Sequence, residues 1–185
     1  MPSVSLLLWQ NDRMPRLQQL DIQCAASLAA LPRNAHLIDE NLRGYAVLLS
    51  AHFQGFCRDL YTEATQIIAS KVRPSLRPLI REQFKSYRKL DSGNPTYDHL
   101  KADFRRFGFI FDMTVDPANS PRLDDLSALN KWRNVAAHQG TTVPAGIPLD
   151  LPSLRGWRTS CDGLAVSLDA ILYNQLRRIL RRNPW

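Results

Sequence analysis

Apolar residues recur at intervals of three or four positions along most of this chain, the spacing that places them on one face of an α-helix. The longest stripe covers residues 39–72, and a second long stripe follows Pro152 and continues to about residue 180. Shorter stripes predict helices over residues 16–31, 78–87, 96–108 and 120–140, whereas residues 3–9 suit a short strand or a frayed end. The pattern therefore predicts an all-α fold, a helical bundle with two long core helices.

The helix predicted over residues 120–140 has clear signals at both ends. Ser120 is a natural N-cap, and Pro121 suits the first helical position, where its missing N–H costs no hydrogen bond. Gly140 is a natural stop, because glycine adopts the left-handed conformation that commonly follows a helix. A loop rich in proline and glycine then runs to Pro152, so this helix is expected to be separate from the last one.

The composition fits one basic domain. The chain has 185 residues, of which 44% are apolar and 22% charged, and it carries a net charge of +7 with 19 arginines against 5 lysines. A basic surplus favours a polyanionic partner, which can be RNA, DNA or an anionic membrane surface. Arginine suits phosphate because its planar fork binds two oxygens at once. A compositional bias of the source genome would give the same excess, and both explanations stay open.

The cysteines indicate a reducing compartment, and the apolar runs indicate neither a signal peptide nor a membrane-spanning helix. Cys24, Cys57 and Cys161 all fall at apolar positions of predicted helices, and no pair of them has the spacing of metal ligands. An odd number of such residues argues against a disulfide framework. The apolar start of the chain lacks the positive charges of a signal peptide, and no apolar run approaches 18 residues. We therefore expect a cytoplasmic protein with no membrane partner.

One segment carries candidate chemistry, the run from Arg133 to Gly140. Asn134 and His138 are four residues apart, so they share a helix face, and the long side chain of Arg133 can swing toward the imidazole. These groups suit metal-free RNA cleavage by attack of the 2′-hydroxyl on the adjacent phosphate. Histidine can move protons near neutral pH. A guanidinium can stabilise the negative phosphorane, and asparagine can orient either the imidazole or a phosphate oxygen.

A plainer interpretation of the same residues is that His138 caps a helix end and Arg133 is a surface charge. The other histidines have plain interpretations as well. His36 belongs to a turn between helices, His52 lies beside the apolar stripe of the long second helix, and His99 begins a later helix and is expected to be exposed. No Gly-rich phosphate loop, catalytic carboxylate pair or Ser/His/Asp pattern is present.

The stretch Arg133-Asn134-Val135-Ala136-Ala137-His138 resembles the Arg-Asn-x-x-x-His motif of the HEPN superfamily of RNA endonucleases. Residues 47–60 are similar to the long second helix of the branch often labelled RiboL-PSP. The order of the predicted elements also resembles that branch, from the long amphipathic helix through the motif helix to the final helix. The resemblance covers residues 39–180, and its motif is fairly specific in this context.

The resemblance implies a HEPN-like bundle over residues 39–182, preceded by an N-terminal helix and lead-in over residues 1–38. It implies that Arg133 stabilises the phosphorane, Asn134 orients and His138 handles protons, with no metal and no cofactor. HEPN domains commonly pair as homodimers whose motif helices build one composite active site. Many act as toxins or antiviral defence effectors, and an antitoxin or a sensor protein often accompanies them.

The chain departs from this family at one position of the second helix. Relatives often carry an acidic residue about where Gln54 stands, so any acidic support would come from Asp59 or Glu63. Candidate RNA contacts outside the motif are Lys131 and the pair Arg105 and Arg106, which is interleaved with aromatic residues. Such interleaving is also typical of a helix with one core face and one solvent face.

Three functions are therefore open. The sequence favours a ribonuclease toxin or defence effector. The main alternative is a non-catalytic HEPN module that binds RNA or a partner protein, although retention of all three motif residues argues against lost activity. A basic helical DNA-binding protein ranks last, because no helix-turn-helix with a persuasive recognition helix is present.

Overall fold

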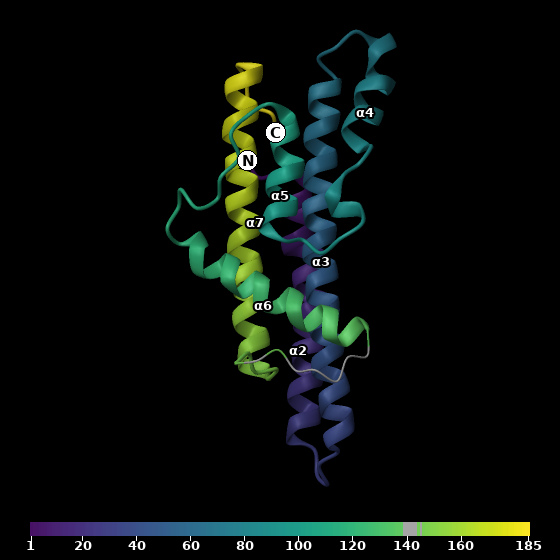
Figure 1. Cartoon of the computed structure of the whole chain (residues 1–185), viewed down its shortest axis with the longest axis vertical. Coiled ribbons are helices and arrows are strands. Elements are labelled where there is room, and N and C mark those ends of the chain that lie inside the picture. The colour runs from purple at the N-terminus through teal and green to yellow at the C-terminus, as the bar shows by residue number, and fades with distance from the viewer. Residues whose placement is uncertain (139–143, 145) are drawn as a thin grey trace.

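The computed structural model describes residues 1–138, 144 and 146–185, and all regular structure in these residues is helical (Figure 1). The predicted all-α class is therefore confirmed. No helix in the described part of the chain is both long enough and apolar enough to cross a membrane. The α-helices are α1 (Val4–Leu8), α2 (Met14–Ala29), α3 (Ala35–Ala69), α4 (Arg77–Lys85), α5 (Tyr97–Phe104), α6 (Asn119–Ala137) and α7 (Leu151–Leu180).

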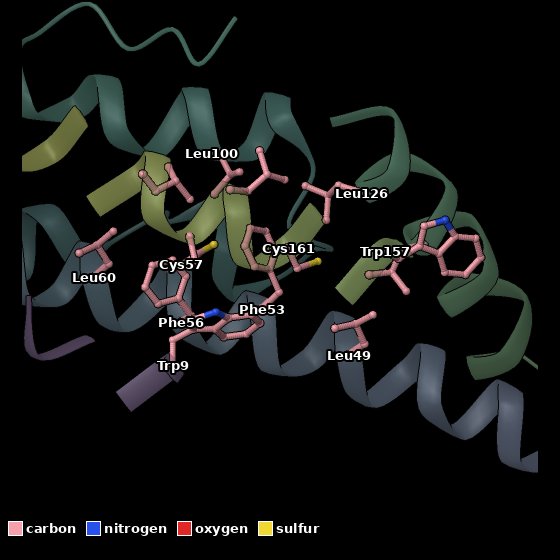
Figure 2. Close-up of a cluster of buried hydrophobic side chains, with 14 of the residues drawn as sticks. Trp9, Leu49, Phe53, Phe56, Cys57, Leu60, Leu100, Leu126, Trp157 and Cys161 are labelled. Carbon is pink, nitrogen blue, oxygen red and sulfur yellow. The ribbon is translucent and has the colours of Figure 1, made fainter. Parts of the chain in front are cut away.

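Two long helices, α3 and α7, form the spine of the molecule, as the apolar stripes predicted. They lie side by side and run in the same direction, and α2 packs antiparallel to α3 (Figure 1). Helix α6 crosses α3 and α7 and packs on both of them. The fully buried side chains at the centre come from both long helices: Leu49, Phe53, Phe56 and Leu60 of α3 and Cys161 of α7 (Figure 2), together with Leu164 and Leu168 of α7.

The prediction of a strand or frayed end at residues 3–9 is wrong, because this segment forms helix α1. The hydroxyl of Ser3 caps the helix by accepting from the Leu6 N–H at 3.0 Å. Glu63 of α3 accepts from the backbone N–H groups of Val4 and Ser5 at 3.0 and 2.9 Å. These bonds satisfy the free N–H groups of a helix start, and they come mainly from a residue distant in the sequence. A π-helical turn, Trp9–Arg13, joins α1 to α2.

Most other boundaries differ from the predicted ones by a few residues. Asn34 caps α3 by accepting from the Leu37 N–H at 3.1 Å, so the long helix begins at Ala35, ahead of the predicted start. Helix α6 begins at Asn119, before the predicted N-cap Ser120, and the predicted stop at Gly140 lies outside the described residues.

The helix predicted over residues 78–87 ends before Tyr87, which lies outside α4. Its side chain is exposed, and its backbone has a φ of 60°. Helix α4 already ends at Lys85, and the chain then turns into a short 3₁₀ helix, Lys89–Asp91. The spacing of the apolar residues continues to Tyr87, so it did not predict this turn.

The three cysteines are buried and free, as their apolar positions predicted. Burial raises the pKa of each thiol above its ordinary value. The thiol groups are therefore protonated at neutral pH and act as small apolar side chains of the core.

An ion pair between α2 and α7 is expected to make stability depend on pH. Buried Asp21 accepts two hydrogen bonds of 2.8 Å from Arg155, and these bonds lower the pKa of the carboxyl group. The contribution of this ion pair to the free energy of unfolding is complete above the ordinary carboxyl pKa, and it is lost as the pH falls through the lowered pKa of Asp21. Asp21→Asn should cost about 1–3 kcal/mol of unfolding free energy at pH 7, and the cost should shrink in acid.

Urea unfolding of both proteins at several pH values measures this difference. The matched control is Asp39→Asn, which removes a surface pair with Arg43 one helical turn away and should cost less than about 0.5 kcal/mol. A constant difference between the parent and Asp21→Asn from pH 7 to pH 2 would contradict the assignment.

Candidate functional site

Helix α6 presents the candidate motif at its C-terminal end while its opposite side is held in the core. Leu126 and Leu129 are buried, and so is the polar side chain of Asn130. The Asn130 Oδ1 accepts from the Ser50 hydroxyl at 3.1 Å, and the Asn130 Nδ2 donates to the Pro95 carbonyl at 3.4 Å. These bonds tie α6 both to α3 and to the loop before α5, so the last turns of α6 have a defined position.

The structure brings two of the three predicted catalytic residues into direct contact. Arg133 is half-buried, and its Nη1 donates to the Asn134 Oδ1 at 3.3 Å. His138 is the C-cap of α6, and its backbone N–H donates to the Asn134 carbonyl at 3.1 Å. The side chains of Asn134 and His138 are both exposed. The motif therefore lies at an open helix end, with a guanidinium, an amide and an imidazole on neighbouring turns.

Asn94 is a member of this cluster that the sequence did not single out. Its Nδ2 donates to the Asn134 Oδ1 at 2.8 Å, so that oxygen accepts from two side chains at once. Asn94 stands in the loop between Asp91 and Thr96, and its partner Asn134 lies 40 residues further along the chain. His99, expected to be exposed, is half-buried, and its Nδ1 lies 2.8 Å from the Asn94 carbonyl oxygen.

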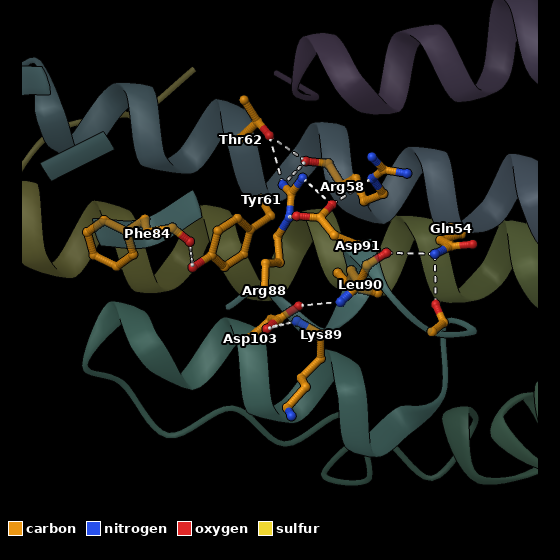
Figure 3. Close-up of polar contacts among 11 residues, drawn as sticks. Gln54, Arg58, Tyr61, Thr62, Phe84, Arg88, Lys89, Leu90, Asp91 and Asp103 are labelled. Carbon is orange, nitrogen blue, oxygen red and sulfur yellow. Dashed lines mark hydrogen bonds and ion pairs between the residues drawn. The ribbon is translucent and has the colours of Figure 1, made fainter. Parts of the chain in front are cut away.

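Gln54 of α3 holds the loop that carries Asn94 (Figure 3). Its Nε2 donates to the carbonyls of Leu90 and Gly93 at 2.6 and 2.7 Å. Asp103 fixes the same loop from α5 by accepting from the backbone N–H groups of Lys89 and Leu90 at 2.9 Å. Gln54 therefore reaches the motif only through the loop backbone, and a neutral amide suits that role because it has N–H groups to donate to carbonyls.

The two carboxylates suggested as accessory acids are engaged elsewhere. Asp59 pairs with Arg13, and Glu63 holds the start of α1. Ser50 is the residue of α3 that contacts Asn130 of α6. Glu63 lies 13 residues beyond Ser50, which corresponds to roughly 20 Å along the helix axis. The structure therefore does not bring either group to the motif. His52 lies at the edge of the core, where burial lowers the pKa of its imidazole.

The suggested RNA contacts fall in two different places. Lys131 is exposed and lies two residues before Arg133 on α6. Arg105 and Arg106 form a 3₁₀ turn at the far end of α5, where Arg106 donates to the Gln83 carbonyl. The neighbouring aromatic residues Phe104 and Phe107 are buried. The basic and aromatic pattern there therefore has a core face and a solvent face, and only Lys131 is near the motif.

A groove of about 390 Å³ begins at the motif and runs between α6 and the start of α5. Its polar lining includes Tyr97, whose hydroxyl donates to Asp112 at 2.7 Å. Burial is the main cause that raises the pKa of Tyr97, so its phenol stays neutral. The groove is lined by Asn94, Thr96, Tyr97 and Asp98 from the α5 side and by Leu123, Leu126, Ser127, Asn130, Lys131 and Asn134 of α6. Asn94 and Asn134 therefore stand at the junction between the motif and this groove.

Within residues 1–138, 144 and 146–185, no group of three or more histidine, cysteine or carboxylate side chains is placed to hold a metal ion. Comparisons of the chain with protein-family models, with curated proteins and with solved structures found no match.

Proposed function

We propose that this protein is a metal-independent RNA endonuclease whose active site contains Arg133, Asn134 and His138. The observation that carries the proposal is the open C-terminal end of α6. There the Arg133 guanidinium contacts Asn134, which also lines a groove, and His138 follows Asn134 one turn later. The net charge of +7 favours a polyanionic substrate.

The proposed reaction is an internal transfer at one phosphate. The ribose 2′-oxygen forms a bond to phosphorus, the bond from phosphorus to the 5′-oxygen breaks, and a 2′,3′-cyclic phosphate remains. The 2′-hydroxyl gives up its proton as the new bond forms, and the leaving 5′-oxygen takes up a proton. His138 serves this proton transfer, because imidazole both accepts and donates protons near neutral pH. Arg133 donates to the oxygens of the crowded, negatively charged phosphorane. The Asn134 Oδ1 holds the Arg133 fork, and the Asn94 Nδ2 donates to the same oxygen.

The biological setting that we propose follows the resemblance to the HEPN superfamily. In that setting the bundle is HEPN-like, and two copies pair so that their motif helices face each other in one composite site. The protein acts in the cytoplasm as a toxin or an antiviral defence effector, and an antitoxin or sensor protein controls it. An exposed motif at a helix end supports this arrangement, because a second copy can approach it.

The test is incubation of the purified protein with single-stranded RNA in excess EDTA, beside the double variant Arg133→Ala, His138→Ala as a background measurement. We expect the parent to cut in EDTA and to leave 2′,3′-cyclic phosphate ends, and the double variant to be inactive. Cleavage only after a divalent metal is added, or equal cleavage by both proteins, would overturn the proposal. RNA binding without cleavage would instead favour a non-catalytic binding module.

A further inference from the structure

We infer that the groove beside Asn134 is a subsite for one unpaired guanine of the RNA substrate, and that Asp98 recognises its Watson–Crick edge. The inference rests on the proposed function and adds a sequence preference to it. The groove follows α6 from Asn134 back to Leu123, eleven residues or roughly 16 Å along the axis. Its volume of about 390 Å³ lies in the range of small-ligand sites, roughly 300–1,000 Å³. Proteins that recognise the sequence of single-stranded RNA commonly bind bases that are unstacked and turned outward.

The groove has an apolar floor and a polar rim, which is the division a nucleobase needs. Leu123 is half-buried and offers aliphatic carbon to the flat face of a base, and buried Leu126 lies beneath the groove. Asp98, Ser127 and Lys131 are exposed along the groove. A base can therefore lie with its ring on aliphatic carbon and its edge toward hydrogen-bonding groups.

The rim groups are free to bind a ligand, whereas the deeper polar groups already have partners. Asn130 donates to the Pro95 carbonyl, and the Tyr97 hydroxyl donates to Asp112. In the described part of the chain, Asp98, Ser127 and Lys131 make no side-chain hydrogen bond or ion pair. A carboxylate, a hydroxyl and an ammonium group thus face the groove without a protein partner.

Guanine is the base whose edge fits a free carboxylate. A carboxylate only accepts hydrogen bonds, and it binds best to two parallel donors. The guanine edge offers N1–H and an N2 amino group side by side. Adenine and cytosine place a ring-nitrogen acceptor beside their amino donor, and uracil offers one N–H between two carbonyl oxygens. Asp98 would meet a repelling lone pair with each of these, which is discrimination against the wrong base. Lys131 is placed to neutralise an adjoining phosphate.

Mapping the cut positions in a random single-stranded RNA pool, in EDTA, tests the inference. We expect the parent to cut at a fixed offset from guanine with at least tenfold preference over other bases. Asp98→Asn should lose most of that preference and still cut, because the motif is unchanged. The matched control is Asp124→Asn, since Asp124 is exposed on α6 and outside the groove, and it should keep the parental preference.

A second readout uses one RNA that carries either guanosine or inosine at the preferred position. Inosine lacks the N2 amino group, so the parent should cut it more slowly by about tenfold, whereas Asp98→Asn should cut both RNAs equally. Cleavage by the parent without a guanine preference, or a preference that survives in Asp98→Asn, would overturn the subsite and leave the endonuclease proposal intact. Absence of any cleavage by the parent would overturn the endonuclease and the subsite together.

Discussion

Replacing His138 with glutamine is expected to lower kcat/KM for RNA cleavage by about 10²- to 10⁴-fold, the contribution usual for a positioned proton-transfer group. Glutamine has a similar reach and can form hydrogen bonds, but it cannot take up or release a proton near neutral pH. His138 is exposed at the end of α6, so the substitution should change the free energy of unfolding by less than about 0.5 kcal/mol. The measurement is the initial cleavage rate of a fluorescent RNA in EDTA, beside a melting curve monitored by circular dichroism.

The matched control is His36→Gln, because His36 is an exposed histidine in the first turn of α3. It is expected to cut RNA at the parental rate. A His138→Gln protein that folds normally and retains more than about a tenth of the parental rate would remove His138 from the proton-transfer role. If both variants lost activity equally, the loss would not report on the motif, and the residue assignment would have to be withdrawn.

Trp9→Ala is expected to destabilise the protein by about 3–5 kcal/mol, the range for a large aromatic residue removed from a core. Trp9 is fully buried, and its ring centre lies 5.9 Å from that of Phe53 and 5.7 Å from that of Phe56 (Figure 2). Its indole N–H donates to Asp162 of α7 at 2.9 Å. The substitution therefore leaves a cavity between three elements and removes a hydrogen bond. Chemical denaturation measures the change, which is a large share of the roughly 5–15 kcal/mol typical of a domain.

Leu8→Ala is the control for Trp9→Ala, since Leu8 is the neighbouring residue but is 47% exposed. It is expected to cost less than about 1 kcal/mol, because little apolar surface is returned to water. If Trp9→Ala cost no more than Leu8→Ala, the first helical turns would not share the cooperative core of α3 and α7.

The helices with long apolar stripes could be predicted from the order of the residues alone. In α3 and α7 a residue such as Phe53 or Leu164 repeats a period that extends over many turns, so each helix has one face that must be buried. The start of α5 was also predicted, since the helix expected from residue 96 begins at Tyr97, and Thr96 caps it by accepting from the His99 N–H at 3.2 Å. The candidate motif was readable too, because Arg133, Asn134 and His138 are neighbours along the chain and helix geometry is local.

Features that depend on residues far apart in the sequence could not be predicted, because they arise from the packing of the helices. Helix α1 has only five residues, too few to be stable alone, and its start is held by Glu63, which is 58 residues beyond Ser5. The same holds for Asn94, which meets Asn134 across 40 residues, and for Gln54, which holds the Asn94 loop from α3. Local spacing cannot specify such pairs, because they exist only after packing of α3, α5 and α6 has brought them together.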